Sequence, residues 1–130
     1  MGWGAANHTV DNMDSFEQLT AWQTGMQLVK EVYAFTQNFP ASEQFGLTAQ
    51  LRRASTSILA NLSEGYARKS ASDKAYKYVI SRGECSETHA LILISIALGY
   101  LSAEQAKHVL DLAQHTGKLL TGLIRAYSHL

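Results

Sequence analysis

The sequence predicts an all-α protein, an antiparallel up-down-up-down four-helix bundle, on three observations. Apolar residues recur at alternating three- and four-residue steps in four separate segments, which is the spacing of one face of an α-helix. Short corners separate these segments, so consecutive helices are expected to run antiparallel. The sequence contains no extended alternation of apolar and polar residues of the kind that indicates a strand.

The first helix is expected over residues 16–38 and the second from about residue 47 to residue 70. Phe39-Pro40 ends the first helix, because the residue before a proline disfavours helical backbone. The predicted core stripes are Leu19, Trp22, Met26, Val29 and Tyr33 in the first helix, and Leu47, Leu51, Ala54, Ile58, Asn61 and Gly65 in the second.

The third helix is expected to start at a cap on Ser70 or Ser72, with Asp73 in its first turn, and to end at Gly99. Beyond residue 90 it is apolar on nearly all sides, whereas a bundle helix needs one apolar face. We therefore expect a second copy of the chain to cover part of it, through Leu91, Ile92, Ile96 and Leu98. The predicted core stripe is Tyr76, Ile80, Gly83, Glu87, Ala90, Ile94, Ala97 and Leu101.

The fourth helix is expected to start at Ser102, which forms a capping-box pattern with Gln105. Its main predicted stripe is Val109, Leu112, Thr116, Leu119 and Leu123.

Composition restricts the class of protein. The 130 residues are 46% hydrophobic, which excludes a disordered chain, and the net charge is zero, which argues against a strongly basic nucleic-acid binder. Residues 1–15 are expected to form a flexible tail, and residues 16–130 the single domain. Cys85 is the only cysteine and no apolar run reaches the ~20 residues of a membrane span, so we expect a cytoplasmic protein.

Polar residues occupy predicted core positions at Asn61 and Glu87. Counting outward from the corner near residue 70 places Glu87 beside Arg53, and Glu64 beside Lys77. A buried carboxylate needs a cationic partner or it takes up a proton. We interpret Asn61, Glu64 and Glu87 as residues that set the register between helices. The alternative is a functional polar pocket.

Positive charge is concentrated in residues 52–82, which carry seven basic residues against two acidic ones. Two interpretations are open: a nucleic-acid-binding surface, whose field a symmetric oligomer would repeat, or a solvated face with local ion pairs. The candidate nucleic-acid-binding residues are Arg52, Arg53, Arg68, Lys69, Lys74, Lys77 and Arg82.

The sequence predicts no catalytic residue, metal site or cofactor. Cys85 and His89 have the four-residue spacing of zinc ligands, but no second ligand pair accompanies them. There is no phosphate-binding glycine loop either. We therefore expect a protein that is not an enzyme.

Several motifs resemble those of a known family: the Gln50-Leu51-Arg52-Arg53 run, residues 61–65 and residues 83–87. They are similar to the bacterial four-helix bundle proteins called 23S rRNA-intervening sequence proteins. That family is related to the accessory variability determinant of diversity-generating retroelements, a ring-shaped homopentamer that binds nucleic acid and a reverse transcriptase. The resemblance implies a cytoplasmic, non-enzymatic, ring-shaped homopentamer with an RNA- or DNA-binding role. The alternative is a scaffold that binds a protein partner and no nucleic acid.

Overall fold

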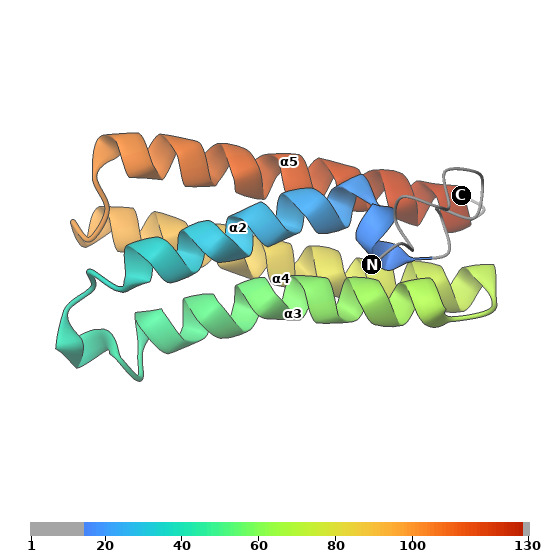
Figure 1. The fold of residues 1–130 in the computed structure, drawn as a ribbon, viewed down its shortest axis with the longest axis horizontal. Helices are drawn as coiled ribbons and strands as arrows, with labels where there is room; N and C mark the ends of the chain where they lie inside the picture. Colours follow the sequence, from blue (N-terminus) through green and yellow to red (C-terminus); the bar gives the residue numbers. More distant parts are fainter. Residues whose placement is uncertain (1–14, 129–130) are drawn as a thin grey trace, which may run out of the picture.

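The computed structural model describes residues 15–128. Except for Ser15, the expected flexible tail lies outside these residues. All regular elements of the described chain are helical, and four long helices lie side by side along the long axis of the molecule (Figure 1). This confirms the predicted all-α four-helix bundle. The elements are η2 (Phe16–Gln18), α2 (Thr20–Thr36), η3 (Ala41–Glu43), α3 (Leu47–Ala67), α4 (Ala71–Ala97) and α5 (Ala103–Tyr127).

Local sequence signals set the ends of the helices. Ser70 caps α4 by accepting a hydrogen bond from the Asp73 backbone N–H, and Ser102 and Gln105 form the predicted capping box of α5. Gly99 follows α4 with a positive φ of 79°, which glycine adopts at little cost. Glu43, four residues before the start of α3, caps this helix, because its carboxylate accepts a hydrogen bond from the Leu47 backbone N–H at 3.0 Å.

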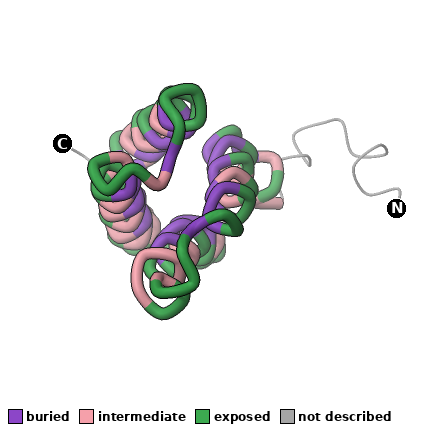
Figure 2. The backbone as a smooth tube through the Cα atoms, turned by 90° about the vertical axis from the view of Figure 1, so that its left-hand side faces the viewer, coloured by how far each residue is buried: buried purple, intermediate pink, exposed green. Residues whose placement is uncertain are grey.

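The core runs between the four helices, and Figure 2 shows their buried segments turned toward the middle of the bundle. The predicted stripes of α3 and α5 are largely confirmed, because residues such as Leu51, Ile58 and Val109 are fully buried. In α2, the buried residues lie on a neighbouring side of the helix and not on the predicted stripe. Trp22 is only half-buried and Tyr33 is exposed, and the buried positions of α2 are Ala21, Thr24, Gly25, Leu28, Val32, Phe35 and Thr36.

The predicted core stripe of α4 is wrong for most of its length, because it lies on the outside of the bundle. Tyr76 is 67% exposed and Ile94 is 47% exposed. Of that stripe, only Leu101, which follows the helix, is buried. The buried face of α4 instead consists of Ala75, Tyr78, Ser81, Cys85, Thr88, Ile92 and Ser95.

Small polar side chains can form this buried face because backbone carbonyls satisfy them. The Ser81 hydroxyl donates across the helix interface to the Ile58 carbonyl at 2.7 Å. Thr88 and Ser95 donate to carbonyls of their own helix at 2.9 and 2.8 Å. Such hydrogen bonds remove most of the cost of burying a hydroxyl. Their small size also lets α4 lie close to α3.

Candidate interaction surfaces

Most of the exposed large hydrophobic side chains of the described residues lie along the outer face of α4. Seven large hydrophobic side chains are exposed among the described residues; four of them belong to this helix, and a fifth, Leu98, is its C-cap residue. Monomeric proteins rarely expose contiguous apolar surface of this kind unless it binds something. We use the term outer face for the exposed apolar residues on this side of the helix, among which the exposed Ser86 and the partly exposed Glu87 also lie: Tyr76, Val79, Gly83, Ala90, Leu93, Ile94, Ala97 and Leu98.

The four predicted interface residues of α4 do not share one environment. Leu98 is 54% exposed and belongs to the outer face. Leu91 and Ile96 are partly buried and pack against the core. Ile92 is completely buried inside the bundle, so its assignment to an interface between copies is wrong. The error arises because neighbouring residues on a helix point about 100° apart, and a continuous apolar run therefore covers both faces.

Five of the seven candidate nucleic-acid-binding residues make contacts within the bundle. The Arg52 guanidinium lies 4.5 Å from the centre of the Tyr33 ring and donates to the Thr36 hydroxyl at 3.0 Å, which ties α3 to α2. Lys74 donates to the Tyr66 carbonyl at 2.6 Å. Arg53 and Lys77 pair with carboxylates of the neighbouring helix, and Arg82 contacts Thr121 of α5.

Arg68 and Lys69 lie at the corner between α3 and α4, and both are exposed. The structure therefore brings together only part of the basic cluster as a solvent-facing surface. We call Arg68 and Lys69 the corner pair.

Arg53 joins α3 to α4, as the sequence predicted. It pairs with Glu87 and lies 3.5 Å from the Glu84 carboxylate. The hydrogen bond from Arg53 lowers the pKa of Glu87 below its usual value. The expectation that Glu87 is buried is wrong, however, because its side chain is 41% exposed and that of Arg53 is 48% exposed. The pair faces solvent since Glu87 is on the outward stripe of α4.

The other two predicted register residues behave differently from each other. Glu64 accepts a 2.6 Å salt bridge from Lys77, which confirms the expected pairing of α3 with α4. This hydrogen bond lowers the pKa of Glu64. Asn61 is half-buried and donates to the Ser57 carbonyl and hydroxyl at 2.9 and 3.0 Å, one turn earlier in α3. Both of these hydrogen bonds are therefore local to one helix.

Cys85 is buried against α5. Its thiol donates to the Ala113 carbonyl at 3.3 Å, and burial raises its pKa to about 11. The thiol is therefore protonated at neutral pH, which disfavours a nucleophile. Within residues 15–128, no group of three or more His, Cys, Asp or Glu side chains is placed to hold a metal ion.

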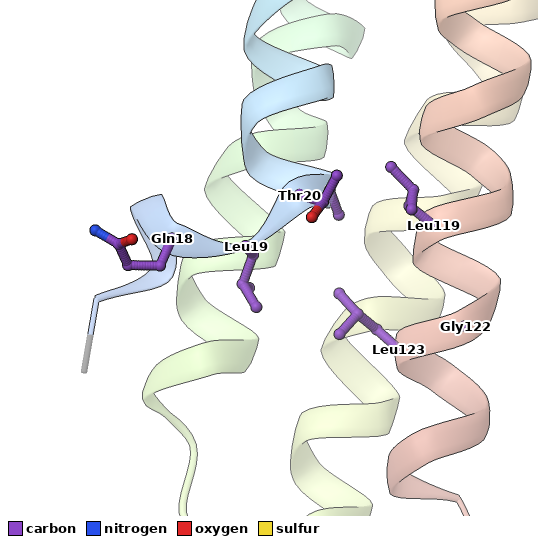
Figure 3. A pocket seen from close by; sticks show the side chains of 7 residues that line it. Gln18, Leu19, Thr20, Leu119, Gly122 and Leu123 are labelled. Atoms are coloured by element: carbon purple, nitrogen blue, oxygen red, sulfur yellow. The ribbon is translucent and has the colours of Figure 1, made fainter. Parts of the chain in front are cut away.

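One hollow beside α5 borders the start of α2, and another borders α4. The first has a volume of about 370 Å³ and lies between α5 and the start of α2, where Leu119 and Leu123 face Leu19 (Figure 3). It is mainly apolar. The second is larger, about 650 Å³, and lies between α4 and α5. We call it the α4–α5 groove; its lining residues are Arg82, Ser86, Gln114, Gly117, Lys118, Thr121, Gly122 and Arg125.

Sequence reasoning missed the α4–α5 groove. It identified Arg82, but Lys118 and Arg125 are more than thirty residues further along the chain. The available signal was their seven-residue spacing, which places both side chains on one side of α5. Only the packing of α4 on α5 shows that Arg82 lies beside them.

The fold and these surfaces define a small helical-bundle protein with a largely apolar outer helix face. Residues 17–122 match the model of the 23S rRNA-intervening sequence protein family, and the chain belongs to this family. The resemblance of the motifs to that family is thereby confirmed. The relation to the retroelement accessory protein stays a prediction.

A solved structure from the S23 ribosomal protein family supports the same assignment. It is a protein of unknown function from Bacteroides thetaiotaomicron, 25% identical in sequence, with a TM-score of 0.73. The similarity covers 82% of this chain and 99% of that chain. No curated protein matches the sequence. None of the described helices combines the length and apolar character that crossing a membrane requires.

Proposed function

We propose that this protein is a cytoplasmic, non-enzymatic assembly module that forms a homo-oligomer through the outer face of α4. The observation that carries the proposal is the exposure of four large hydrophobic side chains on α4 and of a fifth on its C-cap residue, Leu98. Covering such a face removes apolar area from water, which is the main driving force of protein association.

The spacing along the outer face favours another helix as its partner. Positions 76, 83, 90 and 97 repeat every seven residues, and positions 80, 87 and 94 fall between them. This 3.5-residue average is the period of helices that pack along their length. A Cβ on Gly83 would meet nothing within 4 Å, so a second helix has room to approach closely. A second copy supplies a helix with the same pattern.

The family resemblance specifies the assembly further, as a ring-shaped homopentamer. Light scattering coupled to size exclusion measures the mass directly, and we expect five times the 14.3 kDa mass of one chain. A mass equal to a single chain at micromolar concentration would contradict the proposal. A different multiple would retain the assembly and reject the pentamer.

A matched pair of variants tests which surface assembles. Ala90→Glu places a charge in the outer face, and Ala60→Glu makes the same change at an exposed position of α3. We expect Ala90→Glu to shift the protein to monomers, because an unpaired charge in an apolar interface is costly to desolvate. Ala60→Glu should leave the mass unchanged. If the two variants had the same oligomer mass, the interface would not lie on the outer face of α4.

Nucleic-acid binding is the second candidate function, and the exposed corner pair favours it. A ring would repeat Arg68 and Lys69 in every copy and so concentrate positive charge despite a net charge of zero. Fluorescence anisotropy with structured RNA and duplex DNA at about 50 and 200 mM salt tests this, because phosphate-driven binding weakens steeply over that range. We expect the unmodified protein to bind nucleic acid at the lower salt concentration, and we expect the Arg68→Gln/Lys69→Gln variant to lose this binding. If no binding occurs at the lower salt concentration, a protein partner becomes the remaining candidate besides the chain itself.

A further inference from the structure

We infer that the α4–α5 groove binds the phosphate groups of a small phosphorylated compound, such as a nucleoside diphosphate. Its lining includes three cations, Arg82, Lys118 and Arg125, and no carboxylate. Ser86, Gln114 and Thr121 add uncharged polar groups to the same surface. This concentration of positive charge lies on a chain with a net charge of zero.

The three cations reach a common level of the bundle. The Arg82 guanidinium lies at the height of Thr121, whose hydroxyl is 3.4 Å away. Lys118 is three residues before Thr121 and Arg125 is four residues after it. With a rise of 1.5 Å per residue, their backbones lie about 5 and 6 Å along α5 from that point. Long side chains can span this distance, so all three can contact one compound.

These cations differ from those that hold the bundle together. Arg53 and Lys77 have carboxylate partners on the neighbouring helix. None of the ion pairs within residues 15–128 includes Arg82, Lys118 or Arg125. These three cations are therefore available to pair with a bound anion.

The hydrogen-bonding groups suit phosphate oxygens. The Thr121 hydroxyl donates to the Gly117 carbonyl at 3.0 Å, so it accepts from Arg82. A guanidinium has five N–H donors, and this contact uses one of them. The others can bind phosphate in the two-bond geometry that arginine favours.

The glycines of the groove leave room for a ligand. A Cβ on Gly117 would meet only the Cys85 sulfur, at 3.9 Å, and one on Gly122 would meet nothing within 4 Å. Packing within the bundle therefore does not require glycine at either position. The resulting volume of about 650 Å³ exceeds the space of a single phosphate and suits a compound of nucleotide size.

Titration calorimetry on the full chain at about 50 mM salt tests the inference, with inorganic pyrophosphate, ADP and a single-stranded RNA oligonucleotide as probes. The main variant is Lys118→Gln/Arg125→Gln, whose two side chains are exposed and whose fold should therefore be intact. Lys30→Gln/Lys107→Gln removes the same number of charges at exposed positions of α2 and α5 outside the groove and serves as the control. We expect pyrophosphate and ADP to bind, with affinity reduced at least about 10-fold in the groove variant and unchanged in the control.

The other outcomes are distinct. RNA binding that is lost in the groove variant, without pyrophosphate or ADP binding, would overturn the small ligand and assign the groove to a nucleic-acid backbone. Absence of binding, or equal losses in the groove variant and the control, would overturn the groove as a phosphate site. The oligomeric state does not enter this test, so the inference and the proposed assembly can fail separately.

Discussion

The two faces of α4 differ in the opposite way from what hydrophobicity alone predicts. The buried face contains Ser81, Thr88 and Ser95, whereas the exposed face contains Tyr76 and Ile94. The difference teaches that side-chain size and hydrogen bonding decide which face of a helix packs within its own bundle. Small hydroxyl side chains satisfied by carbonyls allow close packing beside the buried Tyr78 and Ile92, and other bulky apolar side chains of α4 lie on the exposed face.

The contact between α3 and α4 shows why small residues are needed on the inner side. Gly65 lies so close to α4 that an added Cβ would be 2.7 Å from the Tyr78 ring and 3.0 Å from the Lys77 Cβ. The Tyr78 side chain is itself fully buried, and burial raises its pKa to about 12. A larger side chain at position 65 of α3 would therefore force these two helices apart.

The largest expected effect comes from replacing isoleucine by alanine on the buried face of α4, compared with the same replacement on its outer face. Ile92→Ala removes a completely buried side chain, and we expect a loss of about 2–5 kcal/mol in the free energy of unfolding at any protein concentration. Ile94→Ala removes the same atoms from the outer face, so its cost should appear only where copies associate. Chemical denaturation at two protein concentrations measures both. Equal, concentration-independent losses would show that the two faces are not different.

A pair of glycine substitutions should have the next largest effect. Gly65→Ala places a methyl group against the Tyr78 ring, and we expect it to destabilise the fold by about 1–3 kcal/mol. Gly83→Ala occupies open space in the middle of a helix, where alanine is favoured over glycine by about 1 kcal/mol. The midpoint temperature of thermal unfolding, measured at low protein concentration, should therefore fall for Gly65→Ala and rise for Gly83→Ala. A stabilised Gly65→Ala variant would contradict the close approach of α3 and α4.

Glu87→Ala should have the smallest effect, because its ion pair is partly exposed. Breaking a fully buried pair costs about 3–5 kcal/mol, and we expect a loss well below that figure. The pKa of Glu87 is lower in the folded state, so its contribution is present above the unfolded value of about 4.3. It disappears as the pH falls through the folded value. Denaturation curves at pH 7 and at low pH check this: a wild-type advantage over Glu87→Ala that persists at low pH would contradict the ion pair.

The basic cluster shows how far a site can be predicted from sequence. Seven cations within residues 52–82 suggested one surface, but their side chains project toward different neighbours. Arg52 contacts α2, whereas Arg82 contacts α5. Proximity in sequence therefore predicted the Glu64–Lys77 pair across one corner and did not predict the groove, whose cations come from distant segments.

The sequence by itself determined the number of long helices, the N-terminal caps of α4 and α5, and the positions of the corners. These features depend on local chemistry: Ser70 and Ser102 accept from nearby N–H groups, and Gly99 adopts a positive φ. Only the tertiary structure decided which way α4 turns, because two stripes of that helix were available to the core. The stripe with Ser81 and Cys85 faces inward because close packing and carbonyl acceptors on α3 and α5 accommodate it. The more apolar stripe is thereby left on the surface, where it can serve assembly.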